Sequence, residues 1–175
     1  PFTVTFTFTE DVTGFVVGDI TVAYGTAGSF TAVDAQTYTV DITPDASSTG
    51  TISVDVAGGV AADSAGNGNT AATQFTITFD TVPPVISITG PVNGTLTGSE
   101  SFTFTSDEGT TQAYLNTGTW TNVTSGARID SLNGWSAAAN TDTITIYFRS
   151  TDAAGNITST DSITEGFTYT KNDTI

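Results

Sequence analysis

The sequence predicts an all-β protein built from two β-sandwiches in tandem, and three observations lead to that prediction. Apolar and polar residues alternate in several short segments, most regularly over residues 2–9, where Phe or Val alternates with Thr. Such alternation is typical of a strand with one buried face. Turn-forming clusters rich in Gly, Pro, Asn and Asp separate these segments, and we find no amphipathic helix of ten or more residues. Finally, the second half of the chain repeats motifs of the first, which indicates two modules of similar size.

The strands are expected where the alternation is clearest. In the first half these are residues 2–9, 51–56 and 75–79, and in the second half 85–89, 102–104, 144–148 and 167–169. Short strands joined by polar turns at short spacing are the pattern of a β-sandwich.

The module boundary is expected at Asp80-Thr81-Val82-Pro83-Pro84. Two consecutive prolines stiffen a linker and cannot donate to a sheet ladder. We therefore expect one module over residues 1–80 and a second over residues 81–175. The second module has a strand, Val85–Thr89, ahead of its Phe-Thr-Phe strand, and the first module has no counterpart. The first module is thus expected to be one strand short, as if cut from a longer tandem array.

Composition narrows the range of functions. The chain of 175 residues has 18 acidic and 3 basic side chains and a net charge of −15, which argues against binding to nucleic acid or anionic membranes and favours bound cations. Cys, Met and His are absent, so disulfides, zinc–thiolate sites and Ser-His-Asp catalysis are excluded. No apolar run is long enough to insert into a bilayer. We expect a protein that is not an enzyme.

Several motifs carry a family resemblance. In the first module they are Phe6–Phe15, Asp19–Val22 and Asp63-Ser64-Ala65-Gly66-Asn67; in the second they are Ala113–Trp120 and Arg149–Asn156. The sequence resembles the bacterial immunoglobulin-like (Ig-like) repeats of large secreted surface adhesins. The resemblance implies two tandem Ig-like β-sandwich domains in a monomer at the bacterial cell surface. It also implies neighbouring repeats of the same chain as partners, and a spacer role often stiffened by calcium. The segment Asn133–Asn140 departs from the resemblance because it is longer than the family's usual connection.

A calcium site is expected at the module junction. Ca²⁺ takes six to eight oxygen ligands from carboxylates, carbonyls and water. In an Ig-like sandwich, the loops after the second and sixth strands lie at the end where the chain enters. In the second module they carry acidic and amide side chains, and the incoming linker adds one more, so the expected ligands are Asp80, Asp107, Glu108, Asp152 and Asn156.

The first module has a corresponding set, expected to bind more weakly because it lacks an incoming linker Asp: Glu10, Asp11, Asp63 and Asn67. The alternative is purely structural. In Asp-x-x-Gly-Asn turns the Asp and Asn often hydrogen-bond only their own backbone, and Gly66 and Gly155 would then simply supply positive φ.

The two tryptophans, Trp120 and Trp135, allow a further hypothesis. Flat aromatic faces can stack on sugar rings, whereas the favoured interpretation packs Trp120 in the core and lays Trp135 over an irregular loop. The expected function is that of a structural extender of a secreted adhesin. The alternatives are a module that binds a glycan or protein through Trp135, an accessory domain of a secreted polysaccharide-active enzyme, and an S-layer subunit.

Overall fold

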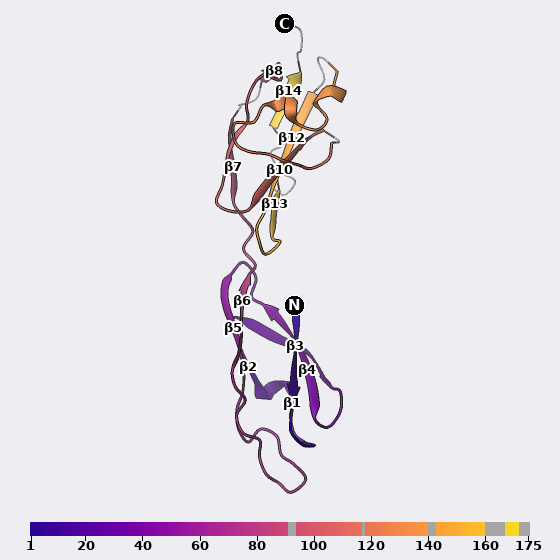
Figure 1. Cartoon of the computed structure of the whole chain (residues 1–175), viewed down its shortest axis with the longest axis vertical. Helices are drawn as coiled ribbons and strands as arrows, with labels where there is room; N and C mark the ends of the chain where they lie inside the picture. The colour runs from indigo at the N-terminus through magenta and orange to yellow at the C-terminus, as the bar shows by residue number, and fades with distance from the viewer. Residues whose placement is uncertain (91–93, 117, 140–142, 160–166, 172–175) are drawn as a thin grey trace. The chain divides into compact units, whose positions relative to one another are not determined.

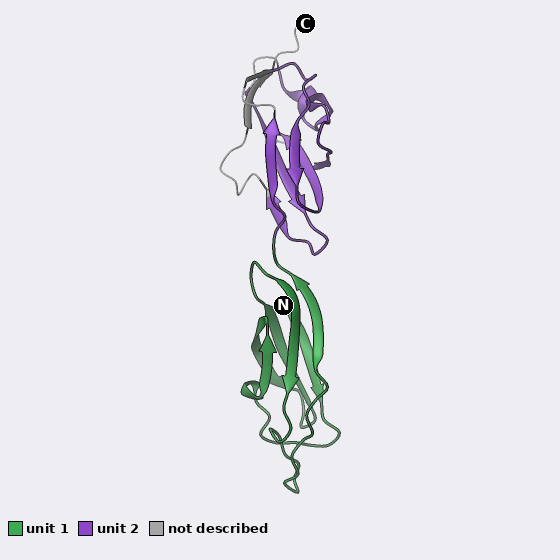
Figure 2. Ribbon diagram, turned by 90° about the vertical axis from the view of Figure 1, so that its left-hand side faces the viewer, with its two compact units in different colours: residues 1–82 green, residues 83–175 purple. Residues whose placement is uncertain are grey.

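A computed structural model shows that the chain forms two compact units, residues 1–82 and 83–175 (Figures 1 and 2). The structure describes residues 1–90, 94–116, 118–139, 143–159 and 167–171. The all-β class is confirmed. Helical structure in these residues consists of three single 3₁₀ turns: η1 (Val17–Asp19), η2 (Ile129–Ser131) and η3 (Trp135–Ala137). Across the described chain, no helix is long and apolar enough to cross a membrane.

Unit 1 consists of two antiparallel sheets of three strands each. The first sheet has the order β1-β4-β3, from β1 (Phe2–Thr7), β4 (Thr37–Pro44) and β3 (Gly25–Ala32). The second has the order β2-β5-β6, from β2 (Ile20–Ala23), β5 (Thr49–Val56) and β6 (Phe75–Asp80). This is the strand order of a constant-type Ig sandwich without its first strand.

The core of unit 1 lies between these two sheets. Alternate residues of the central strands point into it, and the deepest are Val40, Ile42 and Ile52, none of which is exposed. Near one end of the core, Phe15 makes edge contacts with the rings of Phe6, Phe8, Phe30 and Tyr38, at centroid distances of 5.2–5.6 Å. Because side chains alternate between the faces of a strand, shifting β4 by one residue would turn its core residues to solvent.

Unit 2 is also built from two sheets. A pair of strands joins β7 (Ile86–Gly90) to β9 (Thr103–Ser106). The larger sheet has the order β11-β10-β12-β14-β8, with β13 beside β12. Its strands are β8 (Gly94–Leu96), β10 (Thr110–Leu115), β11 (Thr121–Asn122), β12 (Thr143–Thr151), β13 (Ile157–Ser159) and β14 (Phe167–Lys171).

An irregular segment that contains η2 and η3 completes the core of unit 2. It buries Ile129, Leu132 and Trp135 against the core phenylalanines Phe102 and Phe148. Trp135 lies in the segment Asn133–Asn140 singled out above, of which Asn140 is outside the described residues. Gly98 packs so closely on the Trp135 ring that a Cβ there would lie 2.8 Å from an indole carbon.

A buried lysine holds the irregular segment to the larger sheet. Lys171, at the end of β14, is 4% exposed, and its Nζ donates hydrogen bonds to the carbonyl oxygens of Trp135 (3.0 Å) and Ala138 (2.7 Å). The same ammonium lies 4.9 Å from the centroid of the Trp135 ring, within range of a cation–π interaction. One side chain therefore anchors the backbone of η3 and contacts its indole.

Lys171→Met should destabilise unit 2 by about 2 kcal/mol, because the methionine keeps most of the aliphatic chain but removes the donor to both carbonyl groups. Both tryptophans lie in unit 2, so urea unfolding followed by Trp fluorescence reports on this unit alone. Arg128→Met is the matched control, since the Arg128–Asp130 ion pair is exposed and should contribute less than about 1 kcal/mol. Equal losses in the two variants would contradict the anchoring role.

Candidate calcium site

Two acidic loops of unit 2 pack against each other. Asp107-Glu108-Gly109 joins β9 to β10, and the loop from Asp152 to Asn156 follows β12. Gly109 has φ +79°, and a Cβ at this position would collide with the carbonyl oxygen of Thr151, so the loops meet backbone to backbone. As a result, a carboxylate oxygen of Glu108 lies within 4.8 Å of one from Asp152.

The acidic loops lie where the chain begins unit 2. The Asp107 Oδ1 accepts a hydrogen bond from the Val85 amide (2.7 Å), and the Asp107 amide donates to the Val85 carbonyl (3.3 Å). Val85 immediately precedes β7. Asp107 therefore ties its loop to the incoming chain, while Glu108 and Asp152 form the closely spaced carboxylate pair.

Asp152 is held in place by its own loop. It is 8% exposed; its Oδ1 accepts the Asn156 amide and its Oδ2 the Asn156 side-chain amide, both at 2.8 Å. Burial raises the pKa of Asp152, but hydrogen bonds from the side chain and backbone of Asn156 and from the Gly155 and Ala154 amides outweigh it. The net effect lowers the pKa below its ordinary value of 3.8, so Asp152 is anionic at neutral pH.

The corresponding loop of unit 1 has the same internal bonding. The Asp63 carboxylate accepts the amides of Ala65 and Asn67 (each 2.8 Å) and the Asn67 side chain (2.7 Å). Hydrogen bonds from Asn67 lower the pKa of Asp63. Gly66 and Gly155 have φ +86° and +91°, with no atom within 4 Å of a Cβ built on either. The structural role that the motif allows is thus present in both units.

The remaining acidic residues singled out in residues 1–80 are more dispersed. The Asp11 Oδ1 accepts a hydrogen bond from the Gln36 side chain (2.8 Å). Within residues 1–82, all of which are described, Glu10, Asp11 and Asp63 do not bring three carboxylate oxygens within 4.8 Å of one another. Asp80 ends β6, and its Oδ1 accepts the Val82 amide at 2.9 Å, so this carboxylate lies over the start of the linker.

The donor set of unit 2 fits a hard cation. Asp152 offers an anionic carboxylate whose oxygens accept the Asn156 backbone and side-chain amides, so a cation would share these oxygens with the loop or displace its hydrogen bonds. The ligands that the pair offers are oxygens only, which suit Ca²⁺ or Mg²⁺ and not the nitrogen- and sulfur-seeking transition metals. Two carboxylates are too few for calcium, so backbone carbonyls, water or a third carboxylate would have to complete the shell.

The tryptophans lie in places other than those the favoured interpretation assigned. Trp135 is in the core, 7% exposed, so its ring face is not available to stack on a sugar. Trp120 is half-buried outside that core, with Tyr114 against it edge-on at 4.5 Å and the Arg149 guanidinium 4.5 Å over its ring. Sequence reasoning missed this aromatic group, although Tyr114 and Tyr147 lie on strands whose alternation puts them on one face.

The six strands of unit 1 define an Ig-like β-sandwich. The family model for the bacterial Ig-like domain matches residues 1–79, in agreement with the sequence motifs of the first module. No curated protein matches the sequence.

Gly109→Ala should cost unit 2 about 3 kcal/mol, because the new methyl group must push apart the two acidic loops in addition to adopting positive φ. Gly126→Ala is the matched control: Gly126 has φ +91° but open space around its Cβ position, so only about 1 kcal/mol should be lost. Urea unfolding followed by Trp fluorescence measures both. A Gly109→Ala loss no larger than that of the control would show that the loops are not in close contact.

Asp152→Asn should remove part of the acid sensitivity of unit 2. Since folding lowers the pKa of Asp152, the carboxylate stabilises the unit above its unfolded-state pKa near 3.8, and this contribution disappears as the pH falls through the folded-state pKa. The gap in urea midpoint between parent and variant should therefore be widest at neutral pH and close once the pH falls below the folded-state pKa of Asp152. Asp63→Asn, in the equivalent loop of unit 1, should leave the Trp fluorescence transition unchanged at every pH. A gap that is constant with pH would contradict the assignment.

Proposed function

We propose that the two units are spacer modules of a secreted bacterial surface adhesin. We propose further that calcium bound by the acidic loops of unit 2, together with Asp80, restricts the hinge at Pro83-Pro84. The single observation that supports calcium binding is the approach of the Glu108 and Asp152 carboxylates to within 4.8 Å in loops that also hold the start of β7.

The charge balance supports recruitment of a cation from solution. Two carboxylates at this distance repel each other, and the chain has only three basic side chains against 18 acidic ones. Each of the three has partners elsewhere: Arg128 pairs with Asp130, Arg149 with Gln112 (2.6 Å), and Lys171 with the carbonyl oxygens near η3. A divalent ion would neutralise the pair without drawing on these contacts.

A cation bound by the acidic loops and Asp80 would also restrict the linker between the two units. Asp80 precedes Val85 by five residues, and Val85 is bonded to the acidic loop of Asp107. A cation that coordinates Glu108, Asp152 and Asp80 would close a ring through Thr81–Pro84, in which Pro83 and Pro84 have fixed φ. The linker would lose most of its conformational freedom, and a pair of spacer modules would become stiff.

The spacer role follows from the same features. The family model for bacterial Ig-like domains matches residues 1–79, and the carboxylate pair of unit 2 has no accompanying His or Cys with which to build a nucleophile or base. A spacer role, with calcium as the only cofactor, accounts for both the acidic loops and the proline linker.

Millimolar CaCl₂ should raise the thermal midpoint of unit 2, whereas equal MgCl₂ should have a much smaller effect, because Mg²⁺ retains its water shell more strongly. At a free ion concentration 100 times the dissociation constant, the stabilisation would be about 2.7 kcal/mol. Glu108→Gln should abolish the calcium shift, and Asp130→Asn, which removes an acid of the same unit outside these loops, should keep it. Trp fluorescence reports the thermal unfolding of unit 2. If calcium does not raise the thermal midpoint of the parent protein, the calcium site is overturned.

The flexibility of the hinge can be measured separately. Small-angle scattering should give a narrower distribution of maximum dimensions with calcium than with a chelator for the parent, and Asp80→Asn should remove this difference without unfolding either unit. If Asp80→Asn and the parent are equally flexible in calcium, Asp80 does not act at the hinge.

A further inference from the structure

The loop from Asp63 to Asn67 in unit 1 and the loop from Asp152 to Asn156 in unit 2 hold their asparagines in the same way. In each, the Asp carboxylate accepts the backbone amide of the Asn (2.8 Å in both) and its side-chain amide (2.7 Å in unit 1, 2.8 Å in unit 2). The Asn carbonyl oxygen in turn accepts the Asp amide, at 3.0 Å in unit 1 and 3.1 Å in unit 2. A glycine with positive φ precedes each asparagine. The hydrogen bonds that hold the two asparagines are therefore alike.

The residue after the asparagine differs between the two loops. Asn67 is followed by Gly68, and Asn156 by Ile157, the first residue of β13. The two positions correspond in structure, because each lies opposite the residue that precedes the aspartate of its loop. Glycine has no Cβ, whereas isoleucine is branched at Cβ and shields its own backbone nitrogen. Only the loop of unit 1 therefore leaves this nitrogen uncovered by a side chain.

The backbone nitrogen of Gly68 is also free of hydrogen bonds within its unit. The bridge of Gly68 to Ala62 is bonded through the amides of two flanking residues (3.0 and 2.9 Å), so the Gly68 N–H itself points away from the bridge. No residue of unit 1, all of which is described, accepts a hydrogen bond from this N–H. Asn67 and Gly68 are both exposed, so the nitrogen is accessible.

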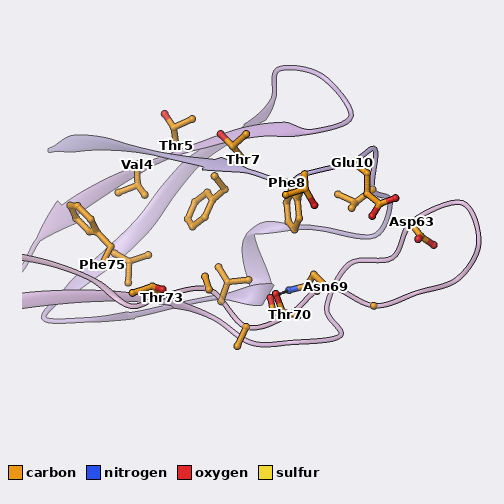
Figure 3. A pocket seen from close by; sticks show the side chains of 18 of the residues that line it. Val4, Thr5, Thr7, Phe8, Glu10, Asp63, Asn69, Thr70, Thr73 and Phe75 are labelled. Atoms are coloured by element: carbon orange, nitrogen blue, oxygen red, sulfur yellow. Dashed lines mark hydrogen bonds between the residues drawn. The ribbon is translucent and has the colours of Figure 1, made fainter.

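Solvent also reaches this peptide bond from the groove beside β1. This groove has a volume of about 510 Å³, and its lining includes Val4, Phe8, Asn67 and Gly68 (Figure 3). Figure 3 shows Asp63 on the loop at one end of the groove. Water and hydroxide therefore have access to the bond between Asn67 and Gly68.

Two other asparagines of the described chain lack one of these features. Asn69 is followed by Thr70, which is branched at Cβ, and its side chain makes four hydrogen bonds with backbone groups. Asn133 is followed by Gly134, but a Cβ on Gly134 would lie 2.6 Å from the carbonyl oxygen of Leu115. The backbone after Asn133 is thus tightly packed, whereas the loop of Asn67 has room to rearrange.

We propose that Asn67 is a site of spontaneous deamidation, and that loss of its amide opens the loop that Asp63 holds. The Gly68 nitrogen attacks Cγ of Asn67 and forms a C–N bond, which closes a succinimide ring. The Cγ–Nδ2 bond breaks, and the side-chain nitrogen leaves as ammonia with the proton from the Gly68 N–H. Water then opens the ring at either of its carbonyl groups and gives aspartate or isoaspartate at position 67. Water is the only other reactant.

The product cannot form the hydrogen bond that closes the loop. Nδ2 of Asn67 donates to Oδ2 of Asp63 at 2.7 Å, and a carboxylate oxygen in its place would put two anionic oxygens face to face. Isoaspartate would also lengthen the backbone by one carbon and disturb the bridge between Ala62 and Gly68. One irreversible step therefore removes the hydrogen bonding that stabilises this loop of unit 1.

Peptide mapping by mass spectrometry, on the full chain aged in mildly alkaline buffer, follows the loss of each amide. Asn67 should lose its amide at least about tenfold faster than Asn156, because the two are bonded alike and the residue that follows them differs. Equal rates at the two positions would overturn the proposal.

Ile157→Gly transfers the glycine to the loop of unit 2. Ile157 is 52% exposed, so its removal costs little packing, and Asn156 should lose its amide about tenfold faster than in the parent. Thr158→Gly is the matched control, since it weakens the same short strand but leaves Ile157 next to Asn156. The proposal is wrong if Ile157→Gly leaves the Asn156 rate unchanged, or if both variants accelerate it equally.

The opening of the loop is measured on Asn67→Asp, which supplies the aspartate product without ageing. Amide hydrogen exchange by NMR should quicken about tenfold at Asp63, whose amide donates to the carbonyl oxygen of residue 67. Exchange at Ile42, in the core strand β4, should stay as in the parent and so show that the unit remains folded. Parent-like exchange at Asp63 in this variant would overturn the opening of the loop.

Discussion

The burial of one apolar layer between two small sheets is the constraint on which the rest of unit 1 depends. Each three-stranded sheet has one apolar face, and only the opposite sheet can cover it. The core-facing side chains of the central strands β4 and β5 are fully buried, as Val40, Ile42 and Ile52 show. Those of the edge strand β6 are not, since Phe75 and Ile77 remain partly exposed to solvent. The same requirement explains the aromatic cluster around Phe15 and the groove beside β1.

The acidic side chains in the loops of this scaffold are stabilised by electrostatic interactions of a few kinds. With three basic side chains against 18 acidic ones, most carboxylates can find stability only in backbone amides, side-chain amides or solvent cations. Asp63 and Asp152 illustrate the first solution, since each is bonded by its own loop and has a lowered pKa. The structural and the metal-binding interpretations of this motif are compatible in unit 2, because a cation would share the Asp152 oxygens with the loop or displace its hydrogen bonds. What distinguishes unit 2 is Glu108, which the close packing at Gly109 brings beside Asp152.

Several local features could be read from the sequence and others could not. The strands β1, β5 and β6 follow from strict alternation, and β4 carried the same signal in Tyr38, Val40 and Ile42 although it was not among the expected strands. β3 is harder to recognise because its sequence is rich in Gly and Ala and its pairing with β4 contains an irregularity between Ala27 and Phe30. The prediction of which tryptophan lies in the core was wrong. A tryptophan in an irregular segment has no periodic pattern around it from which to infer whether its side chain faces the core or the solvent.

The sequence by itself determined the all-β class, the match of residues 1–79 to the bacterial Ig-like family model and the acidic turn motifs, because alternation, turn residues and charge are local properties of the chain. Tertiary structure alone decided which carboxylates meet, since the approach of Glu108 to Asp152 depends on a backbone contact between residues 42 positions apart, at Gly109 and Thr151. It also decided that Trp135 and Lys171 are interior and that Phe75 is not, because burial depends on which elements cover a residue.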